Sequence, residues 1–439
     1  MTIESSYGMW WVPGDPNNRV SGQLTWEALQ PPTLSLLDPP TGMWAGAGFE
    51  EGQSLTFEEV FVPMLHGTLA DSGVVTLLDC SFGGLNLGAT FTPRLRVGSA
   101  LLGVWLDAPD EAAFRRVEID LPGLEAMLGA NPVRPVRKPT NRSHQVRLTL
   151  DDRRHFWKEG ATEVTWEYRW LMSVNNMATQ VEMIPIMILT NSKPKSLGYW
   201  LEEWIIPTNQ LLTIATGAKS NPRSVTSWVK KASPTAQATG IKLWRQGVGA
   251  HNYESRPQLA LLRAGTINLN PGGLPEVIRR VRQLSTDHDI FLSLLAGVIN
   301  IPERPMRNRY LDLMSGLEAY HSQVYGIGPM SLDAFTEKRK SAVESTKTVS
   351  SADRSFIKRW LLTRPNHSLE YRLRQLASKV GILESWDIDP ASMGGLRNDI
   401  AHGNTDIDYQ ILKNAYDQAL DLGRRVALFE LGIVDSGSP

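Results

Sequence analysis

The sequence predicts an α+β protein with several domains, in which a β-rich region of residues 1–260 precedes an all-α bundle of residues 270–439. Three observations predict this division. Short alternating and β-branched runs recur up to about residue 260, and apolar residues recur at helical spacing afterwards. Of the 14 tryptophans, 12 lie at or before Trp244, and such rings suit sheet faces and binding surfaces. The segment 252–273, which ends in Asn-Pro-Gly-Gly, marks the boundary.

The first region contains runs that are typical of strands and are separated by turn signals such as Pro-Gly and Asp-Pro. These runs are Thr56–Val62, Val74–Leu78, Arg94–Trp105, Val117–Leu121, Val146–Leu150 and Val164–Met172. The proline-rich and basic segment Asn131–His144 is predicted as a loop or subdomain boundary. Leu197–Ile214 is predicted to be partly helical, and Ala232–Gly240 is predicted to be a loop.

Four apolar stripes at helical spacing predict the helices of the second region, and a bundle is the natural way to bury them. The stripes are Val277, Ile278, Val281 and Leu284; Tyr310, Leu313, Leu317 and Tyr320; Leu369, Leu373, Leu376 and Val380; and Ile411, Ala415, Ala419, Leu422, Val426 and Phe429. Ser368 caps the third of these helices and Gly381 ends it.

Composition excludes several classes of protein. The net charge of −1 argues against a chain that coats nucleic acid by bulk charge. A single cysteine, Cys80, excludes an intrachain disulfide and a cysteine metal site. The N-terminus lacks the pattern of a signal peptide, and the longest apolar run, Phe291–Ile301, is too short to cross a bilayer. A cytoplasmic protein without membrane contact is therefore expected.

The segment Arg397–Gly403 reads Arg-Asn-Asp-Ile-Ala-His-Gly within the helical region. An arginine holds a phosphate with a planar fork of donors, and a histidine moves a proton near neutral pH. Together Arg397 and His402 form a minimal set for cutting RNA without a metal. The alternative interpretation is a buried arginine–aspartate pair and a histidine that only caps a helix.

A helix is predicted to open near Pro390 and to run to His402, where Gly403 provides a left-handed cap. Residues i and i+5 lie about 140° apart on an ideal helix. Arg397 and His402 therefore approach one another only if the helix ends at the histidine, which Gly403 allows. Thr405 and Asp406 are predicted to cap the next helix.

The Arg-Asn pair at 397–398 and the His-Gly pair at 402–403, followed by a long amphipathic helix, resemble the motif of HEPN-domain ribonucleases. One HEPN subgroup has a tyrosine where this chain has Asn404, so the chain is not expected to belong to that subgroup. The stretch Gly73–Cys80, preceded by a tryptophan-rich opening, resembles the N-terminal domain of ApeA-type anti-phage HEPN proteins. The HEPN resemblance covers residues 270–439, and the ApeA resemblance covers the whole chain.

The resemblance implies a metal-independent endoribonuclease that acts in abortive anti-phage defence, with RNA as substrate and tRNA or another cellular RNA as its target. It also implies a homodimer or higher even oligomer, because HEPN ribonucleases pair two motifs across an interface. Residues 1–260 would then sense a phage-derived trigger or restrain the nuclease. No cofactor and no metal are expected.

Other residues are candidates for supporting roles, each with a structural alternative. Asn398 and Asp399 would orient the histidine or a ribose, but Asp399 also suits an intrahelical salt bridge. Glu318 is a candidate partner of Arg397, and a solvated charge at a helix edge is the favoured alternative. Asp287-His288-Asp289 is better explained as a helix junction than as a metal cluster, since consecutive helical residues point in different directions.

Segment 338–364 carries eight basic residues and two acidic ones, with two aromatic residues between them. Lys358, Arg359 and Arg364 are its candidate RNA contacts, because basic and aromatic side chains together guide and stack a nucleic acid strand. Solvated helix faces are the alternative. The alternative function for the whole chain is a non-catalytic ligand- or glycan-binding protein with a helical dimerisation domain. Cleavage of RNA in chelator, compared with His402→Ala, separates the two functions.

Overall fold

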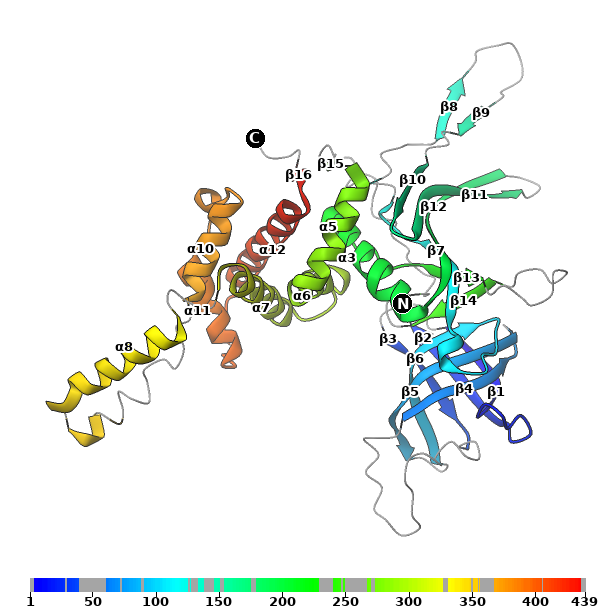
Figure 1. Cartoon of the computed structure of the whole chain (residues 1–439), viewed down its shortest axis with the longest axis horizontal. Coiled ribbons are helices and arrows are strands. Elements are labelled where there is room, and N and C mark those ends of the chain that lie inside the picture. The colour runs from blue at the N-terminus through cyan, green and yellow to red at the C-terminus, as the bar shows by residue number, and fades with distance from the viewer. Residues whose placement is uncertain are drawn as a thin grey trace, which may run out of the picture. The chain divides into compact units, whose positions relative to one another are not determined.

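The computed structural model describes residues 4–27, 30–38, 61–71, 73–87, 91–124, 127, 133–137, 146–150, 154–174, 179–228, 240–245, 248, 267–269, 273–326, 331–348, 350–353, 355, 367–404 and 406–435. The chain forms two compact units, which are mainly β up to Ile267 and mainly α over Asn268–Asp435 (Figure 1). The predicted fold class is therefore confirmed.

The first six strands form an antiparallel barrel in the order β6-β3-β2-β1-β4-β5, which a β5–β6 pairing closes (Figure 1). These strands are β1 (Glu4–Trp11), β2 (Val20–Glu27), β3 (Gln30–Leu36), β4 (Phe61–Leu69), β5 (Gly73–Leu87) and β6 (Phe91–Leu102). Alternate side chains point inward, as the period of two in a strand requires. Trp10, Leu34 and Val97 are fully buried in this core. Gly67 is required beside Trp10, because a Cβ there would overlap the indole ring.

The sheet continues beyond the barrel through β14 (Gly240–Trp244), which pairs with β6, and ends at β10. The strands of this extension are β7 (Ala113–Asp120), β10 (His155–Glu159), β11 (Thr162–Val174), β12 (Thr179–Ser196) and β13 (Ser224–Trp228). A helical segment follows β12 through α2 (Leu197–Trp200), the π-helix η3 (Leu201–Ile205) and α3 (Ile206–Thr216). The buried Trp200 fixes it to the sheet, because its indole Nε1 donates to the Phe114 carbonyl at 3.0 Å.

The second unit is a bundle in which α7 packs against α6, α10, α11 and α12. Its helices are α5 (Gly273–Asp287), α6 (Asp289–Asn300), α7 (Met306–Tyr325), α8 (Leu332–Ser345), α10 (Leu369–Lys379), α11 (Pro390–Ala401) and α12 (Tyr409–Leu431). Val281, Leu317, Leu376 and Leu422 each come from a different helix and are almost fully buried. The strands β15 (Ile267–Leu269) and β16 (Ile433–Asp435) come from the beginning and the end of this unit in sequence and pair with each other. None of the described helices is long and apolar enough to cross a membrane.

Most of the predicted strands and stripes are confirmed. Val74–Leu78 lies in β5, Val117–Leu121 overlaps β7, Val146–Leu150 is β9 and Val164–Met172 lies in β11. Arg94–Trp105 overlaps β6, which ends at Leu102. Leu197–Ile214 is helical, and the first three helical stripes are buried or half-buried. Thr56–Val62 is described only at its last two residues, and residues 232–239 lie outside the described part of the chain.

Three predictions were wrong in detail. Residues 133–137 within the expected loop form strand β8 (Val133–Arg137), because pairing with β9 (Val146–Leu150) outweighs the local proline signal. The helix after His402 is capped by Asp408, whose Oδ1 accepts from Gln410 N at 2.7 Å, and not by Thr405 or Asp406. In α12 the buried face is centred on Ala415, Ala419, Leu422 and Val426. Ile411 and Phe429, at the ends of the predicted stripe, are each 55% exposed.

Candidate functional site

Helix α11 carries the Arg-Asn-Asp-Ile-Ala-His sequence, and Asp389 fixes where the helix begins. Asp389 Oδ1 accepts from the backbone N–H groups of Ala391 at 2.9 Å and Ser392 at 3.3 Å. The Ser392 hydroxyl, which donates to the same carboxylate, holds the pKa of Asp389 below its ordinary value. Pro390 occupies the first helical position, where its missing N–H costs nothing. The helix start is therefore set by local sequence.

The helix ends where the motif histidine stands. His402 is the C-cap residue, and its backbone N–H donates to Asn398 O at 2.9 Å. Gly403 follows with φ +80°, and Asn404 N returns to Asp399 O at 2.9 Å. The expected glycine cap is confirmed. The His402 side chain is exposed, and no described residue hydrogen-bonds its ring. Its ring nitrogens are thus accessible to a ligand from solvent.

The Arg397 side chain contacts a residue of a different helix, α7. Its Nη2 lies 3.5 Å from Glu318 Oε2 on α7, and its Nη1 donates to Asn398 Oδ1 at 3.3 Å. The side chains of Arg397 and Glu318 are 30% and 28% exposed. The buried Nε of Arg397 finds no acceptor among the described residues. Glu318 is therefore half-buried and paired with the motif arginine, not a fully solvated edge charge.

A second arginine, which sequence reasoning missed, lies on the same turn of α7. Arg372 of α10 donates through Nη1 to Ser322 Oγ at 2.6 Å and to the Glu318 carbonyl at 3.2 Å. Its Nε donates to the His367 carbonyl at 3.2 Å. No acidic side chain within the described ranges pairs with it. Arg372 precedes the buried Leu373 in an amphipathic helix, so its position in sequence gives no signal of a site.

The remaining candidate residues fall into three groups. Asn398 and Asp399 are exposed on α11, and in the part of the chain described here no cation pairs with the Asp399 carboxylate. The predicted RNA contacts Lys358, Arg359 and Arg364 lie outside the described residues. Asp287-His288-Asp289 is the junction between α5 and α6, as predicted.

No group of three His, Cys, Asp or Glu side chains suited to a metal ion occurs in the described ranges. Cys80 is buried in the barrel, where burial raises the pKa of its thiol far above the ordinary value.

Each of the two units matches a known protein family. Residues 5–258 match the ApeA N-terminal domain 1, and residues 311–424 match the Apea-like HEPN domain. The chain belongs to the ApeA family. The HEPN match spans Glu318, Arg372, Arg397 and His402, and the expected resemblance is confirmed. Neither the curated proteins nor the solved structures yielded a match.

Chemically, this arrangement offers a cation and a proton carrier at one end of α11. The Arg397 side chain stays 30% exposed beside its contacts with Glu318 and Asn398, and arginine binds phosphate through a planar pair of donors. An exposed imidazole accepts or donates a proton near neutral pH. These are groups that suit phosphodiester chemistry.

Proposed function

We propose that this ApeA-family chain is a metal-independent endoribonuclease of the HEPN type. The observation that supports it most is the end of α11, where the partly exposed Arg397 guanidinium lies beside Glu318 and His402 presents an exposed ring. The Apea-like HEPN match, which covers residues 311–424 and so includes Arg397 and His402, supports this proposal. Abortive anti-phage defence is the proposed cellular role, with the β-rich unit sensing a trigger or restraining the nuclease.

In the proposed reaction a ribose 2′-OH attacks the adjacent phosphorus. The O2′–P bond forms, the P–O5′ bond breaks, and the products carry a 2′,3′-cyclic phosphate and a 5′-OH. His402 takes the 2′-OH proton or supplies the proton to the leaving 5′-oxygen. Arg397 stabilises the charge that builds on the equatorial oxygens in the transition state. Asn398 and Asp399 position the ribose or the histidine.

One histidine supplies one proton-transfer group, whereas the reaction needs a base and an acid. We propose that a second copy of the chain supplies the other His402 across a two-fold axis, since such an axis brings the same patch of both chains together. The composite site is therefore expected in a homodimer or a higher even oligomer. Its substrate is cellular RNA, with tRNA as one candidate.

The test uses the purified full chain and two synthetic oligonucleotides in EDTA: an RNA, and the same RNA with a 2′-deoxyribose at the mapped cleavage position. The RNA is expected to be cut and the substituted strand to stay intact at that position. Arg397→Ala and His402→Ala should each lower the rate at least about 100-fold, in line with the usual contribution of acid–base catalysis. His155→Ala, in the β-rich unit, is the matched control and should cleave normally.

Three results would contradict the proposal. They are wild-type rates in both site variants, cleavage at the 2′-deoxy position, or an activity that EDTA removes and magnesium or manganese restores. A polynucleotide kinase should label the new 5′ ends without prior phosphatase treatment, because the expected leaving group is a 5′-OH. Circular dichroism of each variant shows whether loss of cleavage comes with loss of fold.

A further inference from the structure

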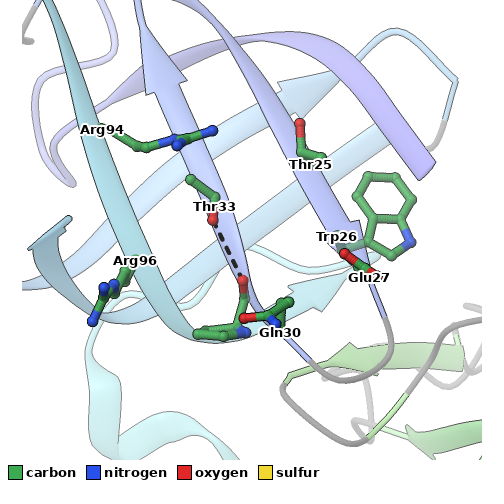
Figure 2. A pocket seen from close by; sticks show the side chains of 8 residues that line it. Thr25, Trp26, Glu27, Gln30, Thr33, Arg94 and Arg96 are labelled. Atoms are coloured by element: carbon green, nitrogen blue, oxygen red, sulfur yellow. Dashed lines mark hydrogen bonds between the residues drawn. The ribbon is translucent and has the colours of Figure 1, made fainter. Parts of the chain in front are cut away.

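The outer face of the barrel carries a polar cavity of about 500 Å³ over strands β2, β3 and β6 (Figure 2). Strand register explains its composition. Thr25, Thr33 and Arg96 lie opposite one another across the three strands, so their side chains share one face. Arg94 stands two residues before Arg96 and therefore lies on the same face, whereas Leu95 between them is fully buried in the core.

The two arginines carry charge that the fold does not use. Neither guanidinium makes an ion pair or hydrogen bond with any residue in the described ranges, and both side chains are exposed. Figure 2 shows the Arg94 side chain, which starts on β6, extending across β3 above Thr33, while Arg96 lies further along β6. Two cations on adjacent outward positions of one strand repel each other, so an anion between or beside them would be stabilised.

The opposite end of the cavity is built from acceptors and a fixed wall. Glu27 and Gln30 are register partners in the β2–β3 pair, and no described residue hydrogen-bonds either side chain. Trp26 forms the wall beside them. Its ring stacks on Trp244 at 3.7 Å between centroids, and its Nε1 donates to Glu4 Oε2 at 3.1 Å. The ring is therefore held in place before any ligand arrives.

We propose that this cavity binds a nucleotide. The phosphates would lie at Arg94 and Arg96, since guanidinium groups bind phosphate oxygens through charge-assisted hydrogen bonds. The ribose hydroxyls would donate to the Glu27 carboxylate, as acidic side chains do in other nucleotide sites. Gln30 supplies a donor and an acceptor for the remaining polar edge. The volume lies within the range of about 300–1,000 Å³ that is usual for small-ligand sites.

The experiment titrates the full chain with ADP, pyrophosphate, adenosine and a single-stranded oligoribonucleotide by isothermal calorimetry. ADP is expected to bind with the highest affinity of the four. Arg94→Ala and Arg96→Ala should each weaken ADP binding at least about tenfold, because each removes a charge-assisted hydrogen bond. Glu27→Gln should weaken ADP binding without changing pyrophosphate binding. Arg115→Ala removes an exposed arginine of β7 outside the cavity and should bind ADP normally.

Each other outcome overturns the proposal. Absence of ADP binding shows that the cavity is not a nucleotide site. Equal affinity for ADP and pyrophosphate reduces it to a diphosphate site, and tight binding of the oligoribonucleotide alone makes it a strand-binding surface. Unchanged ADP binding in the two arginine variants, with normal unfolding midpoints, places the ligand elsewhere. The result is independent of nuclease activity, because His402→Ala should bind ADP as the wild type does.

Discussion

At the scale of single residues, the contact between Glu318 and Arg397 joins two helices that are far apart in sequence. The pair is about 30% exposed and its atoms lie 3.5 Å apart, so it contributes at most about 1 kcal/mol to folding. Its role in the proposed site is to orient the guanidinium. We expect Glu318→Gln to lower kcat for RNA cleavage about tenfold with little change in KM, because misorientation affects the transition state more than ground-state binding.

Glu370→Gln is the control for that prediction. Glu370 pairs with Arg374 at 3.0 Å on the exposed face of α10, and its loss removes a carboxylate without touching α11. Its cleavage should equal that of the wild type. If Glu318→Gln also cleaves at the wild-type rate, while Arg397→Ala is inactive, the carboxylate does not position the arginine.

His321 is a buried histidine of the bundle, and it should make stability depend on pH. Burial lowers the pKa of its imidazole, Gln375 raises it by accepting from Nε2 at 2.8 Å, and the charge of Arg372 lowers it further. The net direction is down from the ordinary value of about 6.5. The unfolded chain therefore takes up a proton that the folded chain does not. Stability should fall as pH decreases below about 6.5.

The measurement compares urea unfolding of the wild type and His321→Gln between pH 7.5 and pH 5. One group changes the slope by at most about 1.4 kcal/mol per pH unit. The wild type should lose stability more steeply on acidification than the variant, which has no group to protonate at this position. Parallel curves for the two proteins would show that His321 is not held neutral in the folded state.

At the scale of elements, one glycine inside α11 and one just after it have opposite structural roles. Gly395 lies inside the helix with ordinary backbone angles, and Gly403 ends it with φ +80°. A Cβ at either position would meet nothing within 4 Å. Gly395→Ala should therefore stabilise the chain by about 0.5–1 kcal/mol by reducing the entropy lost on folding. Gly403→Ala should destabilise it by about 1–2 kcal/mol, since left-handed angles are unfavourable for alanine.

Chemical denaturation of the two alanine variants measures this difference directly. An added Cβ meets no neighbour at either position, so stability changes of opposite sign in the two variants report the backbone angles alone. Cleavage by Gly395→Ala should stay near the wild-type rate. Destabilisation by both substitutions would mean that α11 is not the regular helix described, and would weaken the placement of Arg397 and His402.

At the scale of the whole molecule, the proposed mechanism requires two copies of the chain. Tyr409 and Ile411, at the start of α12, are 65% and 55% exposed and follow His402 along the chain. Large apolar side chains that are exposed and close in the chain to His402 are candidates for a contact with a second copy. We expect Ile411→Asp to shift the protein from dimer to monomer in light-scattering chromatography and to lower cleavage at least about tenfold, because each monomer has one histidine.

Ile290→Asp is the control, because Ile290 is 53% exposed but lies on a different helix, α6. It should leave both dimer and cleavage unchanged. An excess of His402→Ala chains mixed with wild type should also suppress activity beyond simple dilution if subunits exchange. A wild-type protein that is monomeric and cleaves at full rate would refute the composite site.

Much of this fold was predictable because it is encoded over short distances. The stripes at 277–284 and 310–320 are buried as expected, and Ser368 and Gly381 delimit α10. The Gly403 cap was equally predictable from one residue type. The exposure of Ile411 and Phe429 was not predictable, because helical periodicity defines a face of a helix but not how far neighbouring helices cover that face. The strand Val133–Arg137 depends on its partner, so its own Pro135 was misleading.

By itself, the sequence determined the two regions, the cap that ends α11 at His402, and the residues that carry the proposed chemistry. These properties depend on periodicity and on backbone angles, which act within a few residues. Only the tertiary structure decided that Glu318 faces Arg397, that Arg372 contacts the same turn of α7, and that Thr25, Thr33 and Arg96 share one face of a barrel. Those contacts join residues that are distant in the chain. They depend on helix packing and strand register, which local sequence does not specify.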